Sequence, residues 1–237
     1  MKRIGILLTG NGFYDGSSPW DVAFILRAIE SKGTFPVPFA PDLPQGRVIN
    51  HQTEEVTKEK RNALLEASRL VRGQLFKLEE IAPTQIDALI IPGGRGLLLT
   101  LTNFEYNSAD CELYPPLKKL IRGLYIRGKP IAGIGYGAFV IALALRKIAN
   151  PILTPGDDLS LNEHLERMGA IIVNVPPDEV VVDNENNIFT TPGITPEGSV
   201  LKGSIGITSM VESVIEAKRI RRRIDEGNRP ERDNEED

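Results

Sequence analysis

Cysteine and histidine are almost absent from this sequence of 237 residues, which holds one cysteine, Cys111, and two histidines, His51 and His164. A single cysteine excludes an internal disulfide framework and is typical of a protein in a reducing compartment. The two histidines lie far apart in the sequence, and together with one cysteine they do not have the ligand spacing of a metal centre. We therefore expect no metal ion and no organic cofactor.

The sequence also lacks an excess of positive charge and any long apolar run. Its formal net charge is −4, whereas a dedicated nucleic-acid-binding domain is expected to be basic. No stretch approaches the roughly 20 apolar residues of a membrane-spanning helix. The N-terminal residues MKRIGILLTGNG form too short an apolar run for a signal peptide. We expect a cytoplasmic protein that binds neither nucleic acid nor a membrane.

What is present is an alternation of short apolar segments with amphipathic ones. We predict buried strands over residues 3–8, 36–40, 87–92, 130–135 and 170–175, and helices over 22–33, 62–73, 115–129 and 160–170. Strands that alternate with helices favour a mostly parallel sheet with helices on both faces. The turn cluster DNENN within residues 180–192 separates two β-type runs and predicts a small antiparallel hairpin.

The last segments predict one further helix and a charged tail. The chain becomes helical again from Ser199, with an apolar face that includes Val211, Val214 and Ile215. Residues 219–237 alternate blocks of charge and hold almost no apolar side chain, which is typical of a helix end followed by a disordered tail. We predict one α/β domain over residues 1–218 and a separate tail over 219–237.

In parallel sheets, ligands bind beyond the carboxyl ends of the strands, where the chain turns into helices. This rule directs attention to the corners TGNGFYDGSSPWD, PGGRG and GIGYGAF. The last of these has three interpretations. It is a dinucleotide-binding fingerprint, because Gly133, Gly135 and Ala138 spell G-x-G-x-x-A and Asp157 and Asp158 follow about 20 residues later. It is a nucleophile elbow, or it is a tight corner in which glycines permit positive φ and close packing.

The elbow interpretation places the nucleophile at Gly135 or Tyr136. Glycine has no side chain that could attack a substrate, and a tyrosine phenol is a poor acyl or aldehyde nucleophile unless it is strongly activated. The residues alone leave the three interpretations open.

Taken together, the corners resemble one protein family. The resemblance is carried, in the family's order, by NGFYDGS near the start, APDLPQGRVINH (40–51), RNALLEASRLVRG (61–73), DALIIPGGRG (87–96), LTNFEYNSADCEL (101–113), GKPIAGIGYGA (128–138) and VVVDNENNIFTTP (180–192). These motifs are similar to those of the ElbB family, whose name denotes enhanced lycopene biosynthesis. It is a glyoxalase-like branch of the PfpI and class I glutamine amidotransferase-like superfamily. The resemblance implies a flavodoxin-like three-layer α/β sandwich, often a homodimer, and conversion of glyoxal-type aldehydes to hydroxy acids without a cofactor.

The resemblance also implies site residues, and this chain departs from several of them. Gly135 stands where the family has its elbow cysteine, and Asp21 stands where the family carries a glutamate. Gly93 and Gly94 match the loop whose backbone amides face the ligand, but Arg95 replaces an aromatic residue there. Cys111, which we expect to be structural or inert, matches a second family cysteine outside the elbow.

A glyoxalase route needs a thiolate for the covalent step and a nearby group to move the proton. Without the cysteine we predict a degenerate site in a non-catalytic or chemically altered protein, a pseudoenzyme. It would keep a pocket for a small anionic or carbonyl-containing ligand around Asp21, Gly94, Arg95, Gly135 and Tyr136. The first alternative is a cofactor-independent glyoxalase or hydrolase that acts on small aldehydes or amides through Asp21 and water. The second is dinucleotide binding at Gly133–Ala138.

Other interpretations of single residues are structural. Asp21 is also explained as a carboxylate near a helix N-terminus, with Ser17 or Ser18 as the cap. We predict that His51 is structural and that His164 is exposed on its helix. Trp20 is predicted to pack the first helix onto the sheet or to lie in a dimer interface.

Overall fold

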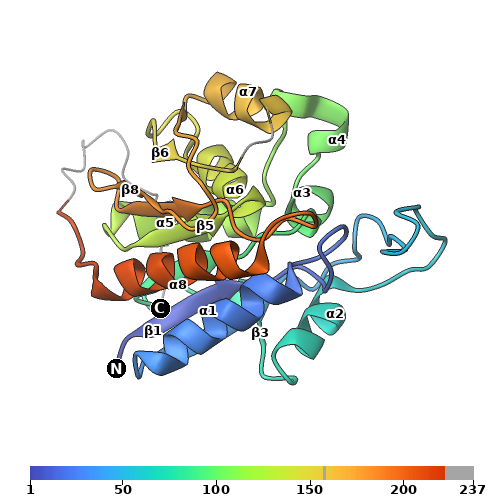
Figure 1. Cartoon of the computed structure of the whole chain (residues 1–237), viewed down its shortest axis with the longest axis horizontal. Coiled ribbons are helices and arrows are strands. Elements are labelled where there is room, and N and C mark those ends of the chain that lie inside the picture. The colour runs from blue at the N-terminus through green and yellow to red at the C-terminus, as the bar shows by residue number, and fades with distance from the viewer. Residues whose placement is uncertain (157–158, 222–237) are drawn as a thin grey trace, which may run out of the picture.

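The computed structural model describes residues 1–156 and 159–221 and shows a sheet covered by helices on both faces (Figure 1). Its strands are β1 (Arg3–Leu7), β2 (Phe35–Ala40), β3 (Phe76–Lys77), β4 (Ala88–Ile91), β5 (Ile131–Ile134), β6 (Ile152–Leu153), β7 (Ile171–Ile172), β8 (Val181–Asp183) and β9 (Ile188–Thr191). Its α-helices are α1 (Pro19–Ser31), α2 (Ala63–Leu70), α3 (Gly96–Leu101), α4 (Phe104–Asn107), α5 (Pro115–Ile126), α6 (Tyr136–Leu145), α7 (Leu159–Arg167) and α8 (Val200–Glu216). Short 3-10 helices cover Leu78–Glu80 (η1) and Ser108–Asp110 (η2). The predicted tail from residue 222 onward and the predicted acidic pair Asp157 and Asp158 lie outside the described residues.

Seven strands form the main sheet in the order β3-β2-β1-β4-β5-β9-β8. Every neighbouring pair is parallel except β8 and β9, which pair antiparallel as the predicted hairpin. A separate parallel pair, β6 with β7, forms a small second sheet. The prediction of a flavodoxin-like three-layer sandwich with a mostly parallel sheet and a small hairpin is confirmed.

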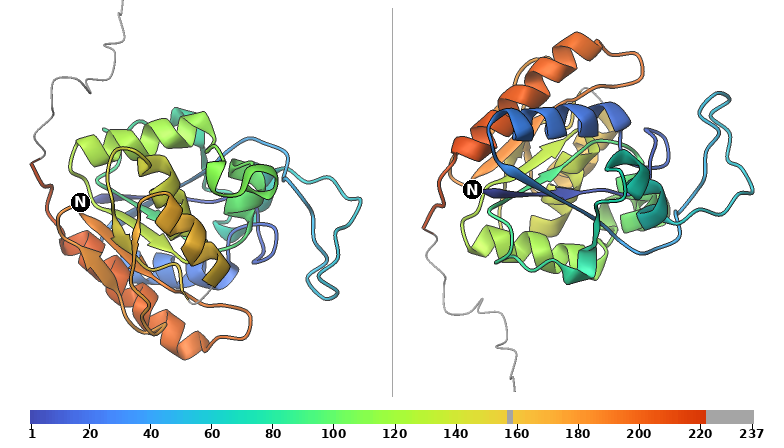
Figure 2. Two further views of the ribbon diagram at one scale, coloured as in Figure 1. Left: turned by 90° about the horizontal axis from the view of Figure 1, so that it is seen from above. Right: turned by 90° about the horizontal axis from the view of Figure 1, so that it is seen from below.

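Side chains that alternate along the strands pack into two apolar layers, one on each face of the sheet. Ile4 and Ile6 of β1 pack on the side of α1, α2 and α8, whereas Leu7 packs on the side of α3, α5, α6 and α7. Helices α1 and α8 lie side by side over one face of the sheet, and α5 covers the other face (Figure 2). The helix α6 is apolar around its whole circumference because its neighbours cover every side, and it is buried from Gly137 to Leu145.

The first helix begins at Pro19, three residues earlier than predicted. The side chain of Ser18 accepts a hydrogen bond from the Asp21 amide, and proline at the first helical position needs no partner for a backbone N–H. The cap therefore places Asp21 in the first turn of α1, directly after the β1 corner. The predicted capping role of Ser18 is confirmed.

The prediction of a buried strand over residues 170–175 is wrong. Only Ile171 and Ile172 form a strand, β7, and Ile171 is 53% exposed. This strand pairs with two-residue β6 outside the main sheet, so one side of it faces solvent. A short apolar run does not by itself distinguish a buried central strand from an edge of a small second sheet.

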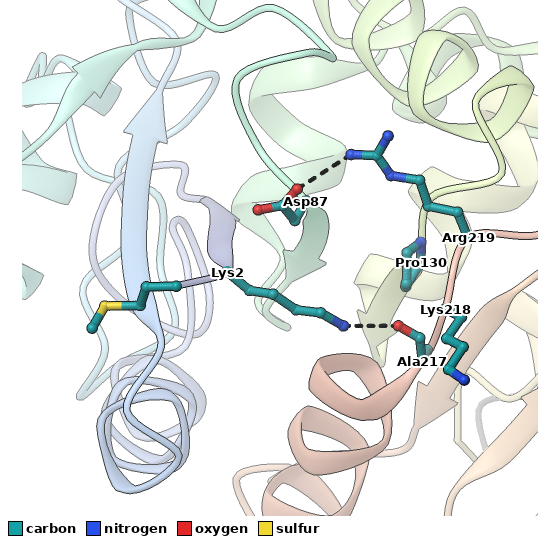
Figure 3. A pocket seen from close by; sticks show the side chains of 7 residues that line it. Lys2, Asp87, Pro130, Ala217, Lys218 and Arg219 are labelled. Atoms are coloured by element: carbon teal, nitrogen blue, oxygen red, sulfur yellow. Dashed lines mark hydrogen bonds and ion pairs between the residues drawn. The ribbon is translucent and has the colours of Figure 1, made fainter.

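The segment after α8 crosses the amino edge of the sheet, where the strands begin. Arg219 forms an ion pair with Asp87 at 3.3 Å, and Lys2 Nζ donates to the carbonyl oxygen of Ala217 at 2.8 Å (Figure 3). The amide of Ile220 donates to the carbonyl of Gly128 at 3.0 Å. A cavity of about 370 Å³ lies between these residues. These contacts tie the end of the described chain to the edge opposite the predicted site.

In the two described ranges, no helix combines the length and apolar character that crossing a bilayer would require.

Candidate functional site at the carboxyl edge of the sheet

The corners that follow β1, β4, β5 and β9 meet at the carboxyl edge, because these strands are adjacent and parallel. The chain places β2 on one side of β1 and β4 on the other, so the strand order reverses between β1 and β4. Ligands in open α/β sheets bind at such a reversal point. The fold therefore brings three of the predicted corners together.

Asp21 lies at the centre of this edge and is 1% exposed. Its Oδ2 atom accepts a hydrogen bond from the Gly93 amide at 2.9 Å, whereas buried Oδ1 makes no hydrogen bond of ordinary geometry within the described chain. Burial raises the pKa of Asp21 to about 7, although the amides of Gly93 and Ile194 and the Ser18 hydroxyl favour the charged form. The carboxyl group is therefore partly protonated near neutral pH.

The P-G-G-R-G loop is packed closely against the β1 corner. The Arg95 amide donates to the Phe13 carbonyl at 2.7 Å, and the Gly96 amide donates to the Gly16 carbonyl at 3.1 Å. Gly94 has φ +112°, and a Cβ atom there would lie 2.2 Å from the Gly16 oxygen. Only glycine fits such an approach. The loop is thus locked to the residues that lead into α1.

The two glycines that were predicted to present their amides to a ligand differ in the hydrogen bonds that these amides make. The Gly93 amide already donates to Asp21 and is not free to bind a ligand. The Gly94 amide makes no hydrogen bond to any described residue. If the loop contacts a ligand through its backbone, Gly94 is the available donor.

Gly135 forms the corner between β5 and α6 with φ +50° and ψ −113°. This conformation is strained for residues that carry a Cβ atom, and it places the corner residue at the N-terminal end of the helix. A Cβ atom built on Gly135 would have only the Pro192 oxygen, at 3.2 Å, and the Pro155 oxygen, at 3.9 Å, within 4 Å. The chain therefore turns from β5 into α6 through a backbone conformation that favours glycine, with space beside the corner residue; that Gly135 is a vacated nucleophile position stays a prediction.

The other glycines of this corner serve close packing. A Cβ atom on Gly133 would lie 2.6 Å from the Ala138 nitrogen, and one on Gly137 would lie 2.4 Å from the Ile91 oxygen. Both positions let α6 approach β4 and β5, as the tight-corner interpretation predicts. Dinucleotide binding at Gly133–Ala138 stays a prediction without support from these contacts.

A cavity of about 350 Å³ opens beside the elbow. Arg95 and Tyr136, two of the predicted ligand-binding residues, line it together with residues that the sequence did not indicate: Arg47, Leu98, Leu99, Phe104, Glu105 and Leu161. Asp21, Gly93, Gly94 and Gly135 are not part of its lining. The predicted site is thus two neighbouring parts, a buried carboxyl group with its glycine loop and an open cavity with arginines.

Arg47 reaches the cavity from the segment between β2 and α2, which projects from the body of the protein (cyan in Figure 2). Gly46 anchors the base of this segment, because its amide donates to Thr100 Oγ1 at 3.2 Å and a Cβ atom there would clash with the Leu99 oxygen. Arg47 falls within the family-like motif of residues 40–51, but that motif did not mark it as a cavity residue, because its place there depends on how a long loop folds back.

The only cysteine of the sequence is enclosed in the core. Cys111 is 0% exposed and packs within the apolar layer around α3, α5 and α6. Burial raises the pKa of its thiol to about 11, and the nearby carboxylates of Glu112 and Asp110 also oppose ionisation. The prediction that Cys111 is structural is confirmed.

The histidines make structural contacts. His51 Nε2 accepts a hydrogen bond from the Tyr14 amide at 3.3 Å, and Nδ1 lies 3.1 Å from the Ile49 carbonyl oxygen, in agreement with a structural role. His164 is not exposed as predicted, because it is half-buried with its ring edge-on to Phe104 at 5.1 Å. Among residues 1–156 and 159–221, no three side chains of metal-binding type converge.

Trp20 is not enclosed between α1 and the sheet, since 51% of it is exposed. Its predicted alternative place in a dimer interface stays a prediction.

Comparison with known proteins shows which family the chain belongs to. No family model matches the chain. The chain is 30% identical over 224 residues to a rat protein named ES1 protein homolog, mitochondrial, and the match covers 90% of this chain and 83% of that protein. It is 29% identical, over 90% of its own length and 82% of the other, to the human glutamine amidotransferase-like class 1 domain-containing protein 3, mitochondrial.

Solved structures extend the comparison to the fold. A crystal structure of an isoprenoid biosynthesis protein with an amidotransferase-like domain from Ehrlichia chaffeensis has a TM-score of 0.83 and 28% identity, with 90% of this chain and 98% of that chain covered. A variant of DJ-1 from Schizosaccharomyces pombe has a TM-score of 0.56 at 16% identity, over 91% of both chains, which shows a shared fold. The chain shares its fold with PfpI/DJ-1 proteins and belongs to the ES1 family of glutamine amidotransferase-like class 1 proteins, an ElbB-type family.

Proposed function

We propose that this protein is a non-catalytic or chemically altered member of its family that binds a small anionic or carbonyl-containing molecule at the carboxyl edge of the sheet. The observation that carries the proposal is Gly135, which keeps the strained backbone of an elbow and lacks a nucleophile. A cavity with two arginines lies beside it. The cavity and its arginines support ligand binding, whereas the lack of a side chain at Gly135 argues against covalent chemistry.

The absent thiol weighs against the glyoxalase route and against amidotransferase chemistry of the kind that the relatives' names suggest. A covalent intermediate needs an activated nucleophile within reach of a base. Cys111 is enclosed in the core, and Asp21 is buried with one oxygen bound to the Gly93 amide. We infer that the family's chemistry has been lost here together with its nucleophile.

Arg95 and Tyr136 supply the means to bind a ligand. The Arg95 guanidinium is exposed at the cavity and attracts a carboxylate or phosphate, and the half-buried Tyr136 ring forms an apolar wall. The first turn of α6 adds a favourable field for negative charge, because Gly135 supplies no side-chain cap there. These features support an anion or a polarised carbonyl group as the recognised part of the ligand.

Turnover of glyoxal and methylglyoxal tests the proposal. The purified proteins to compare are wild type, Gly135→Cys, Asp21→Asn, and Gly135→Cys combined with Asp21→Glu. We expect no turnover by wild type and measurable turnover in the cysteine variants, highest in the double variant, since glutamate extends the carboxyl group by one methylene. Turnover by wild type that is lost in Asp21→Asn would overturn the non-catalytic interpretation.

One observation favours a second candidate, an enzyme that acts on small aldehydes or amides through Asp21 and water. A carboxyl group with a pKa of about 7 is suited to proton transfer near neutral pH. Its 1% exposure argues that substrate would have to enter by a conformational change. The same assay distinguishes the candidates, because only the enzyme is inactivated by Asp21→Asn.

We further propose a homodimer. The adjacent helices α1 and α8 expose large apolar side chains, namely Trp20, Val200, Leu201 and Ile205. Such exposed apolar side chains on neighbouring helices are typical of an interface. Sedimentation equilibrium of wild type and of Trp20→Ser combined with Leu201→Ser tests this. A dimer that the double substitution leaves intact would place the interface elsewhere.

A further inference from the structure

We infer that the cavity beside the elbow accepts a monoanion with a compact apolar body, and that Glu105 sets the charge of the ligand. This rests on the proposed function, since it names the ligand class for that cavity. The inference depends on the pairing of charges at the cavity mouth and on the chemistry of its walls.

Among the described residues at the mouth of the cavity, one of the two arginines has a carboxylate partner and the other has none. Arg47 forms an ion pair with Glu105 at 3.1 Å, and the Glu105 side chain is only 29% exposed. The Arg95 guanidinium makes no ion pair or hydrogen bond with any described residue. An incoming carboxylate can therefore pair with Arg95 without breaking an existing contact.

The walls of the cavity are apolar. Leu98, Leu99 and Leu161 line it with the rings of Phe104 and Tyr136. The Phe104 ring is held in place from two sides, edge-on to Phe139 at 5.1 Å and to His164 at 5.1 Å. A fixed aromatic wall beside leucines favours a hydrocarbon or aromatic group over a sugar or a peptide backbone.

The size of the cavity limits that group. Its volume of about 350 Å³ lies near the lower end of the range of about 300–1,000 Å³ for ligand pockets. This volume matches a small aromatic acid better than a large cofactor. The ligand is thus a short amphiphile, with its charge at Arg95 and its apolar part against Phe104.

Glu105 opposes a second negative charge. Its carboxylate occupies the other arginine, so a dianion at Arg95 faces a carboxylate and gains no second cation. Replacing Glu105 by glutamine removes the repulsion and frees the Arg47 guanidinium. We expect the preference of the cavity to shift from monoanions to dianions.

Four probes that share structural parts test the ligand class by calorimetric titration at pH 8. They are phenylacetate, benzyl alcohol, acetate and benzyl phosphate, which is a dianion at this pH. We expect wild type to bind phenylacetate about tenfold more tightly than benzyl alcohol or acetate, which corresponds to one good charged or apolar contact. Benzyl phosphate should bind more weakly than phenylacetate.

Variants then separate the roles of the charged groups. Arg95→Gln should lose at least about tenfold in phenylacetate affinity while benzyl alcohol is unaffected, because only the charged probe contacts the guanidinium. Glu105→Gln should raise the affinity for benzyl phosphate relative to phenylacetate by about tenfold. Arg27→Gln and Glu30→Gln are matched controls on α1, on the other face of the sheet, and should leave every affinity unchanged.

Three outcomes would overturn the inference: no binding of phenylacetate by wild type, equal binding of phenylacetate and benzyl alcohol, or an unchanged probe ratio in Glu105→Gln. Failure of the proposed function is a separate result, because it requires turnover of glyoxal or methylglyoxal by wild type. If the protein binds no probe and turns over no aldehyde, the inferred ligand class is wrong, whereas the non-catalytic interpretation is not contradicted.

Discussion

The Oδ2 atom of Asp21 accepts a hydrogen bond from the Gly93 amide, at 2.9 Å, across the boundary between α1 and the loop after β4. A second contact runs in the same place, since the Ser18 amide donates to the Gly93 carbonyl at 2.9 Å. Together they join two corners that lie more than seventy residues apart in sequence. Asp21 therefore acts as a structural connector of the site whether or not it meets a ligand.

The raised pKa of Asp21 predicts that the free energy of unfolding depends on pH. The native protein retains the proton up to about pH 7, whereas the unfolded chain loses it near the ordinary pKa of about 3.9. Between these values the native state binds more protons, so the contribution of Asp21 is fully present below pH 4. It declines as the pH rises, by at most about 1.4 kcal/mol per pH unit.

Asp21→Asn should remove this dependence. We expect the difference in free energy of unfolding between wild type and variant to change steadily from pH 4 to pH 7, to the relative disadvantage of wild type at high pH. Urea unfolding at four pH values measures it. Asp42→Asn, at an exposed carboxylate whose pKa is lowered by its hydrogen bond to Lys77, serves as the control without such a trend. Parallel curves for wild type and Asp21→Asn would contradict the prediction.

A cysteine introduced at Gly135 should be both tolerated and reactive. The φ of +50° imposes a strain of about 1–2 kcal/mol on any residue with a Cβ atom. Gly33→Cys is the matched control, since Gly33 has φ +62° and open space around it. Similar thermal stabilities of the two variants would show that the elbow has room for the side chain.

The two thiols should differ in reactivity. A cysteine at Gly135 lies at the N-terminus of α6, where the helix dipole favours the thiolate and lowers the pKa of the thiol. The pH dependence of iodoacetamide alkylation measures this effect. The midpoint for Gly135→Cys should lie below that for Gly33→Cys, and coincident midpoints would mean that the corner does not activate a thiol.

Cys111 should be unreactive in the native protein. It is fully buried, and its thiol has a pKa of about 11. We expect no reaction with a disulfide reagent in buffer and one thiol per chain in urea. Fast native labelling would show that the layer around α5 and α6 opens. Cys111→Ser should lower the free energy of unfolding by about 1–3 kcal/mol, because it buries a hydroxyl group among apolar side chains.

Much of the fold could be predicted because its signals are local. The apolar runs that became β1, β4 and β5 are bounded by glycine or proline, and the DNENN turn marks the β8–β9 hairpin. Strands that are buried on both faces have continuous apolar sequences, which periodicity recognises. The wrong prediction at residues 170–175 arose because the same pattern also occurs in a strand of the small second sheet.

The site could be predicted only in part, since some of its residues lie at strand ends and others come from segments that the sheet topology does not place. Gly93 and Gly135 closely follow β4 and β5, and Asp21 lies in the first turn of the helix that follows β1, so all three lie at the carboxyl edge by topology. Arg47 comes from an irregular segment and Glu105 from the short helix α4, and their pairing across 58 residues leaves no periodic signal. His164 was misjudged because helix polarity could not show that Phe104 would cover its ring.

Gly193 provides a test of how tightly the site is packed. It has φ +81°, and a Cβ atom there would lie 2.2 Å from Ile134 Cγ2 and 3.5 Å from Asp21 Oδ2. Gly73 has φ +80° with no atom within 4 Å of such a Cβ, so the two glycines share the same φ and differ in their surroundings. Gly73→Ala should lower the free energy of unfolding by at most about 1–2 kcal/mol, the cost of the left-handed conformation.

Gly193→Ala should be less stable than Gly73→Ala by a further ~1–3 kcal/mol, because the added methyl group forces Ile134 to move in a filled interior. Denaturant unfolding of both variants at the same pH gives the difference directly. Since Ile134 precedes Gly135 and Tyr136, the displacement should also weaken ligand binding in the cavity that Tyr136 lines. Equal stabilities of the two alanine variants would mean that the corner after β9 is loosely packed.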